Sequence, residues 1–143
     1  MKIIYSLLLH CSILLGQEID LNTLFERASQ NSLSCDSLIT YCQNQYDVLH
    51  QGFLAGGNML MAKHESSTYK KIKLFQKGKR KLENLINKYP KFVTLKWIRY
   101  CIQINAPKFL LYYKKIEEDK NYINMHGTQY QQKSIQKSKL YVN

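Results

Sequence analysis

The pattern that most constrains this chain is an amphipathic period between residues 69 and 88. Side chains that recur every three or four residues lie on one face of an α-helix. The apolar members of the period are Phe75, Gly78, Leu82, Leu85, Ile86 and Tyr89. The cationic members are Lys70, Lys73, Lys77, Arg80, Lys81 and Lys88. At 100° per residue these cations fall within an arc of about 100°. The period therefore predicts a helix that packs on one side and is solvated on the other, and Pro90 ends it.

Segments before this helix predict three more. Apolar residues at helical spacing favour a short helix over residues 20–30. Ser34 or Asp36 can cap a second helix, and Asp47 is the expected cap of a third. That third helix contains Gly56 and Gly57, each of which weakens an isolated helix by about 1 kcal/mol. We therefore expect the backbone of a neighbouring helix to approach closely at these glycines.

Two prolines frame the next predicted helix, over residues 92–104. The segment FVTLKWIRYCIQI is mostly apolar, and the helices expected on both sides favour a buried helix over a strand. Pro107 suits the first turn of a last helix. The apolar residues expected on that last helix are Leu110, Leu111, Tyr113 and Ile116.

The predicted fold is all-α, with about five helices arranged as antiparallel hairpins in one helical domain over residues 17–126. A chain of 143 residues with 45% hydrophobic residues is long enough to bury the core of one such domain. Residues 127–143, GTQYQQKSIQKSKLYVN, are polar and show no clear period. We expect them to form a disordered tail.

The first 16 residues are typical of a secretory signal peptide. Lys2 precedes an apolar run, Gly16 is small enough for a cleavage site, and acidic and polar residues follow. The run is shorter than the roughly 20 residues of a membrane span, and the alternative is a buried first helix. The pattern predicts export to the periplasm or the extracellular space, with cleavage near Gly16.

The spacing of Gly78, Leu82, Leu85 and Pro90 resembles the second helix of a tetratricopeptide repeat. The preceding helix lies too far upstream for a 34-residue unit, so the resemblance implies a repeat-like hairpin in a short superhelix rather than a regular array. The segments MLMAKH, FQKGKRKLE, YPKFVTLKWIRYCIQINAPKFLLYY and EEDK also look like a family of small exported bacterial proteins. That resemblance covers about residues 47–123 and implies export and architecture, but no activity.

Export would leave three cysteines, an odd number: Cys35, Cys42 and Cys101. Cys35 and Cys42 stand seven residues apart on one predicted helix, about 10 Å along its axis, which is too far for a disulfide. A disulfide from Cys101 to either of them remains open. The preferred interpretation is that all three are small apolar core residues.

Charge is divided unevenly along the chain. Residues 17–62 hold one basic and five acidic residues, a net charge of −4, whereas residues 63–143 hold nineteen basic and five acidic residues, a net charge of +14. This division favours either an acidic partner for the second half or attraction between the halves.

The sequence contains no recognisable catalytic or metal-binding motif. His64 and Glu65 are not followed by the second histidine of a zinc-protease helix, and neither a phosphate-binding loop nor a serine nucleophile elbow is present. The spacing of Cys35, Cys42 and His50 fits no compact set of metal ligands. We therefore expect no enzyme activity, no cofactor and no metal.

Several polar residues interrupt the apolar helices: His64, Arg99, Gln103 and Asn105. Buried groups of this kind need partners, and Asp119 is the expected acceptor. We favour a structural network that links helices over a ligand pocket. An enzyme using His64 with Arg99 is the least favoured alternative.

The function predicted from the sequence is that of an exported helical scaffold, or a protein–protein interaction module of the bacterial envelope. The alternative is a binder of an anionic ligand or surface, an envelope polymer or nucleic acid, through the cations of residues 69–88. Export argues against nucleic acid. If those cations only keep the protein soluble, we expect the binding site on a concave side near Trp97 and Tyr100.

Overall fold

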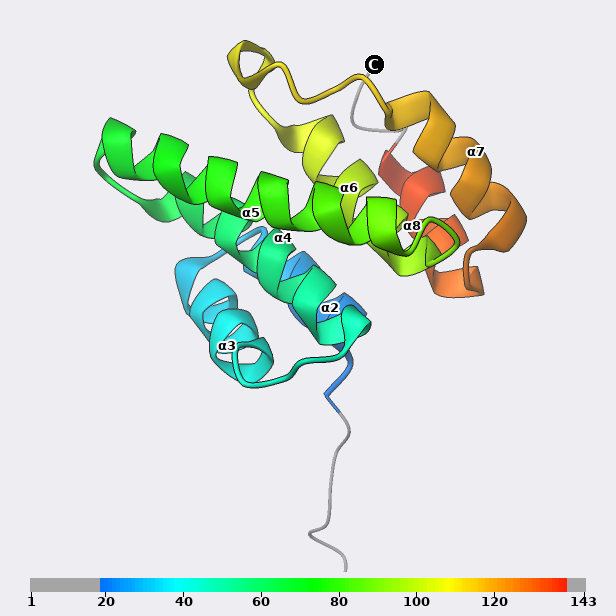
Figure 1. The fold of residues 1–143 in the computed structure, drawn as a ribbon, viewed down its shortest axis with the longest axis horizontal. Coiled ribbons are helices and arrows are strands. Elements are labelled where there is room, and N and C mark those ends of the chain that lie inside the picture. The colour runs from blue at the N-terminus through cyan, green and yellow to red at the C-terminus, as the bar shows by residue number, and fades with distance from the viewer. Residues whose placement is uncertain (1–18, 139–143) are drawn as a thin grey trace, which may run out of the picture.

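The computed structural model describes residues 19–138, and these residues form seven α-helices and one short 3-10 helix, with no strand among them (Figure 1). The helices are α2 (Leu21–Ala28), α3 (Ser32–Cys42), α4 (Val48–His64), α5 (Thr68–Lys88), α6 (Val93–Asn105), η1 (Lys108–Leu110), α7 (Ile116–His126) and α8 (Gln129–Ser138). The prediction of an all-α fold is confirmed. The predicted signal peptide, residues 1–16, lies outside the described residues.

Side-chain caps fix where the first helices begin. The Asp20 carboxylate accepts a hydrogen bond from the Asn22 N–H at 3.1 Å, and the Asp47 carboxylate accepts one from the His50 N–H at 3.1 Å. Asp47 thus caps α4, as predicted. The cap predicted for α3 was wrong. Asn31, not Ser34 or Asp36, caps that helix, because its amide oxygen accepts from the Ser34 N–H at 2.8 Å.

Helix α4 lies at the centre of the fold and contacts α2, α3, α5 and α6. Figure 1 shows α4 and α5 side by side as a hairpin, with α2 and α3 on one side of the pair and α6, α7 and α8 on the other. Gly78 permits the close contact within the hairpin. A Cβ atom at Gly78 would lie 2.5 Å from the Ala55 carbonyl oxygen. The backbone approach expected at Gly56 and Gly57 was wrong, because side chains fill the space there: a Cβ at Gly56 would lie 2.8 Å from both Phe25 and Ile98, and one at Gly57 would lie 3.1 Å from Ile39.

The core is built around Trp97, which is fully buried in α6. Its ring centroid lies 5.6 Å from that of Phe25 and 6.4 Å from that of Phe53. Leu82, on the predicted apolar side of α5, is also fully buried. One cluster therefore joins helices from both ends of the chain, as expected for a single domain.

The last helix predicted from Pro107 begins later in the structure, at Ile116 of α7. Pro107 precedes the short η1, and Leu111 then adopts a left-handed backbone conformation with φ of 50°. A left-handed residue cannot continue a right-handed helix, so the chain stays irregular until α7 begins at Ile116.

The disordered tail predicted for residues 127–143 is also wrong over residues 129–138, which form α8. Gln131 and Ile135 of α8 are buried. Three side-chain hydrogen bonds hold α8 to α6: Trp97 Nε1 donates to Ser134 Oγ at 2.7 Å, the Gln131 amide donates to Thr94 Oγ1 at 3.1 Å, and the Tyr100 and Ser138 hydroxyls pair at 3.0 Å. Thr94, Trp97 and Tyr100 of α6 thus find hydrogen-bond partners on this polar helix. Residues 139–143 lie outside the described part of the chain.

Candidate functional site

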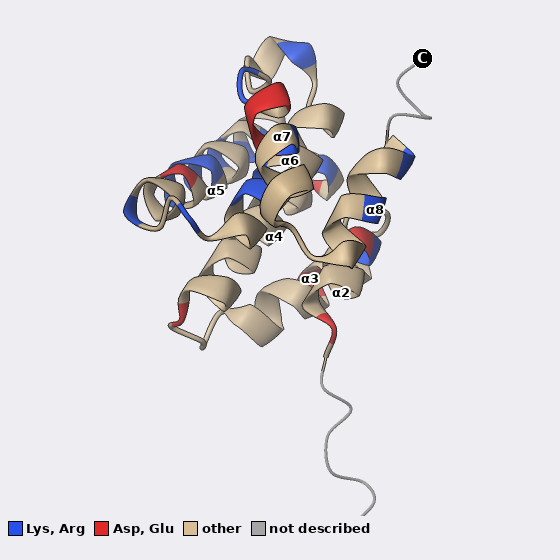
Figure 2. Ribbon diagram, turned by 90° about the vertical axis from the view of Figure 1, so that its right-hand side faces the viewer, with Lys and Arg blue, Asp and Glu red and all other residues tan. Residues whose placement is uncertain are grey.

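The predicted cations of residues 69–88 form one exposed surface on α5, which we call the cationic face. Its members are Lys70, Lys73, Lys77, Arg80, Lys81 and Lys88. Five of them are exposed and Lys81 is half-buried. Figure 2 shows basic residues along much of α5. Within residues 19–138, none of the six takes part in an ion pair. The helix therefore presents positive charge that the described chain leaves uncompensated.

Repulsion within the cationic face is visible at Lys81. Partial burial lowers the pKa of Lys81, and the neighbouring charge of Lys77 lowers it further. The ion pairs of the described residues each join two residues of the same half of the chain, either before residue 63 or after it. The alternative of attraction between the halves thus has no direct ion pair to support it among the described residues.

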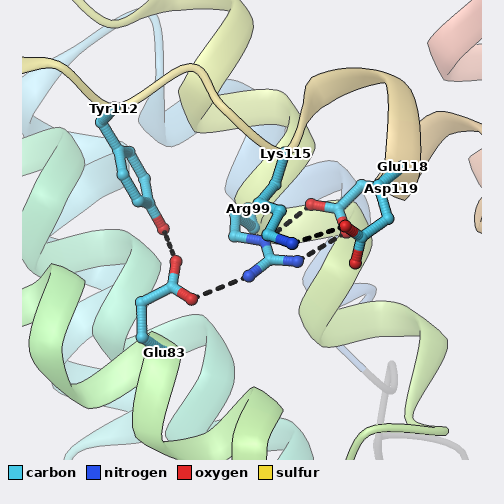
Figure 3. A network of polar contacts seen from close by, with 6 residues as sticks. All are labelled: Glu83, Arg99, Tyr112, Lys115, Glu118 and Asp119. Carbon is cyan, nitrogen blue, oxygen red and sulfur yellow. Dashed lines mark hydrogen bonds and ion pairs between the residues drawn. The ribbon is translucent and has the colours of Figure 1, made fainter.

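Beneath the loop that joins α6 to α7, a buried guanidinium links three segments of the chain (Figure 3). Arg99 Nε and one terminal nitrogen donate to the two carboxylate oxygens of Asp119, both at 2.7 Å, and the other terminal nitrogen donates to Glu83 at 2.7 Å. The side chain of Arg99 is 4% exposed and that of Asp119 is fully buried. Burial alone would lower the pKa of Arg99, but the bonds and charges of the two carboxylates outweigh it and raise that pKa.

Tyr112 extends this network into the loop between α6 and α7. Its hydroxyl donates to Glu83 Oε1 at 2.6 Å, and burial together with this bond raises the pKa of Tyr112. The sequence interpretation missed both residues. A signal for Glu83 was present, because it is the only acidic residue between Ser66 and Ile116. A single carboxylate on a cationic helix marks a position where a buried cation needs a counter-charge.

Only two of the five residues predicted for the buried network belong to it. Arg99 and Asp119 are paired as expected. Gln103 is buried, but its Oε1 has no hydrogen-bond partner among residues 19–138. Asn105 is exposed and donates to the Cys101 carbonyl at 2.9 Å within its own helix. His64 ends α4, and its buried Nε2 also has no hydrogen-bond partner in the part of the chain that the structure describes. The spacing of four residues correctly placed Arg99 and Gln103 on one face of the helix. It could not show which hydrogen-bond partners on neighbouring segments each side chain meets.

The least favoured alternative was an enzyme using His64 with Arg99. No hydrogen bond joins these two residues, and carboxylates already occupy the donors of Arg99. The three cysteines among residues 19–138, Cys35, Cys42 and Cys101, are free thiols. Burial raises the pKa values of Cys35 and Cys42 to about 11, with smaller contributions from Asp36 and Asp47 respectively. Both thiols therefore stay protonated near neutral pH. The nucleophilic form of cysteine is the thiolate, so neither side chain is a nucleophile at that pH.

The concave site expected near Trp97 and Tyr100 is not available. Trp97 is fully buried and Tyr100 is 3% exposed, because α8 covers both. An open hollow lies instead where the chain passes from α5 to α6, lined by Pro90, Lys91, Val93, Tyr122 and His126. Lys96 already lies over the Tyr122 ring, 4.4 Å from its centroid, and the Tyr122 hydroxyl donates to the Lys91 carbonyl. The Tyr122 side chain of the hollow is thus engaged through both its ring and its hydroxyl.

Comparisons of the chain with protein-family models, with curated proteins and with solved structures gave no match. The resemblance to small exported bacterial proteins therefore stays a prediction. No cluster of three or more potential metal ligands occurs in the described part of the chain. Among residues 19–138, no helix is both long enough and apolar enough to cross a membrane.

Proposed function

We propose that this protein is a non-enzymatic helical binding module that recognises an anionic partner through the cationic face of α5. The observation that supports this most strongly is the set of cations on one arc of α5, which form no ion pair within the described chain. Like charges on one surface repel each other, and an anionic partner replaces that repulsion with attraction.

The network around Arg99 also supports this proposal, because it has a structural role that leaves the cations of α5 exposed. Glu83 is a carboxylate of α5, but Arg99 and Tyr112 engage it from α6 and from the loop. Its charge is therefore compensated within the fold rather than against the lysines of its own helix. The network fixes α5 against α6 and α7, and the cationic face stays on the outside.

The proposal includes export and a tetratricopeptide-like scaffold. The apolar run before Gly16 supports export, and the α4–α5 hairpin with its small residue at Gly78 is consistent with a repeat-like scaffold. Under export, an anionic component of the bacterial envelope is more accessible than nucleic acid. The partner class that follows is an acidic surface of the envelope.

We expect the triple substitution Lys73→Glu, Lys77→Glu and Arg80→Glu to weaken binding to an anionic polymer at least about tenfold, because each cation near an anionic surface contributes about 1 kcal/mol. The measurement is the affinity of the full chain for labelled poly-L-glutamate, by fluorescence anisotropy. The free energy of unfolding should change by less than about 0.5 kcal/mol, because these side chains are solvated.

A matched control separates this surface from net charge. The substitutions Lys91→Glu, Lys133→Glu and Lys137→Glu change the net charge equally at exposed positions outside α5. The proposal predicts that this control keeps most of the affinity. Equal losses in both triple variants would contradict it, because attraction would then follow total charge alone.

A further inference from the structure

The loop between α6 and α7 displays three large apolar side chains to solvent. Phe109 is 74% exposed, Leu111 is 63% exposed and Tyr113 is 47% exposed. Lys108 and Lys114 lie on either side of them in the sequence, and both are exposed. Exposed apolar side chains of this size, so close together, mark a contact surface more often than a solubilising one.

The backbone of this loop holds the three exposed side chains, Phe109, Leu111 and Tyr113, in place. Tyr112 points inward, where its ring packs edge-on against Phe75 of α5 at 5.7 Å between centroids and its hydroxyl donates to Glu83. Leu111, directly before it, has φ of 50°, a conformation that non-glycine residues rarely adopt. Sustained strain of this kind requires the surrounding structure to enforce it. Tyr112 is thus the anchor, and Leu111 and Tyr113 are turned outward on either side of it.

The three exposed side chains of the loop lie on the same surface as the cationic face. The contacts of Tyr112 with Phe75, with Lys79 (whose amine lies over its ring at 5.0 Å) and with Glu83 place the loop alongside the middle of α5. At 100° per residue, Ile72 and Tyr69 lie between that side of α5 and the arc of Lys73 and Arg80. Ile72 is 44% exposed and Tyr69 is 73% exposed. Apolar side chains and cations therefore share one surface.

The acids that come next along the chain are already paired. Glu117 and Glu118, at the start of α7, form ion pairs with Lys120 at 3.1 Å and with Lys115 at 2.6 Å. Glu83 is engaged by Arg99 and Tyr112. The surface thus combines uncompensated positive charge with protruding apolar groups, the combination that binds proteins to the interface of an anionic membrane.

We propose that the loop of residues 108–114 inserts its apolar side chains into an anionic lipid surface while the cationic face of α5 contacts the headgroups. This inference rests on the proposed function and names its partner class. A projecting loop does not need a partner of complementary shape when that partner is a fluid interface, whereas a protein partner would have to supply a matching hollow. Phe109 and Leu111 enter the acyl boundary, Tyr113 lies at headgroup depth, and the lysines extend toward phosphate.

The test is quenching of a tryptophan placed in the loop. Full-length Phe109→Trp is mixed with phosphatidylglycerol vesicles that contain brominated lipid. Trp97 is fully buried and supplies a constant background. Leu33→Trp is the matched control, because Leu33 is 78% exposed on α3. We expect the indole introduced by Phe109→Trp to shift its emission to the blue and be quenched, and the indole introduced by Leu33→Trp to do neither. Equal quenching in both variants, or quenching in neither, would overturn the inference.

A second pair of variants tests the energetic role of the loop. Leu111→Asn introduces a residue that tolerates the left-handed conformation, and Phe109→Ser removes an exposed ring. The double variant should therefore fold normally. It should bind phosphatidylglycerol vesicles at least about tenfold more weakly than the wild type, because it loses the burial of two large apolar groups. Leu33→Ser should bind as the wild type does. Unchanged binding by the double variant would overturn the inference.

The same variants separate the inference from the proposed function. If the loop is not quenched but Lys73→Glu, Lys77→Glu and Arg80→Glu still lose poly-L-glutamate binding, the partner is an acidic macromolecule, and only the lipid inference is wrong. If the triple variant binds both poly-L-glutamate and vesicles as the wild type does, the proposed function fails as well.

Discussion

Replacing Arg99 with alanine is expected to destabilise the fold by about 3–5 kcal/mol, because it leaves the fully buried Asp119 carboxylate without its partner. Breaking a buried ion pair on one side costs more than the pair contributes, since the remaining charge stays out of water. The loss also frees Glu83, which holds Tyr112 and therefore the loop between α6 and α7. Urea denaturation with a two-state fit measures the change in free energy.

Arg99→Met with Asp119→Leu is the control for this prediction. An apolar pair of similar volume removes both charges together, so it should be tolerated better than Arg99→Ala alone. A change of less than about 0.5 kcal/mol for Arg99→Ala would contradict the account, because Asp119 would then have found solvent or another partner.

Replacing Trp97 with alanine is expected to cost about 3–5 kcal/mol, as is typical of removing a buried tryptophan. The ring contacts Phe25 and Phe53, and its N–H bonds Ser134 of α8. The variant should therefore loosen α8 as well as weaken the core. Denaturation gives the energy, and hydrogen exchange of the α8 amides gives the local effect.

Trp97→Phe separates these two consequences. It keeps much of the apolar volume and loses only the N–H, so the global cost should fall to about 1–2 kcal/mol while the amides of α8 still exchange faster. If Trp97→Phe left the exchange of α8 unchanged, the bond to Ser134 would not hold that helix in place.

Period and charge were sufficient to predict the most regular part of the fold. In α5, one side is apolar, the other is basic and Pro90 ends the pattern, so the predicted segment differs from Thr68–Lys88 by a single residue at its start. The helix over residues 92–104 was predicted within one residue at each end from a mostly apolar segment between two expected helices. Where local propensity and packing favour the same structure, the sequence shows it directly.

Local pattern failed where tertiary partners decide the structure. Helix α8 is too polar to predict from hydrophobicity, yet Gln131, Ser134 and Ser138 stand three or four residues apart and meet polar groups of α6. The opposite error occurred at Leu111, where a run of apolar residues indicated a helix. The inward anchoring of Tyr112 and the left-handed backbone of Leu111 override that tendency.

One part of the candidate site could be predicted from local pattern, and the other part could not. The cationic face could be predicted because exposed side chains follow the helical period alone. The buried network could be predicted only in part, since the pairing of Arg99 with Asp119 and Glu83 depends on how three segments meet. The lone acid of α5 was the available signal for the missing member.

The most direct test of the cationic face as the binding surface is the salt dependence of poly-L-glutamate affinity, compared between the wild type and Lys73→Glu, Lys77→Glu, Arg80→Glu. Contacts between a cationic surface and a polyanion release counterions, so affinity falls steeply as salt rises. We predict that the wild type loses at least about tenfold in affinity between roughly 50 and 200 mM salt. The residual binding of the triple variant should change much less over the same range. Parallel salt dependence in the two proteins would contradict the account, because the charges that bind would then lie elsewhere.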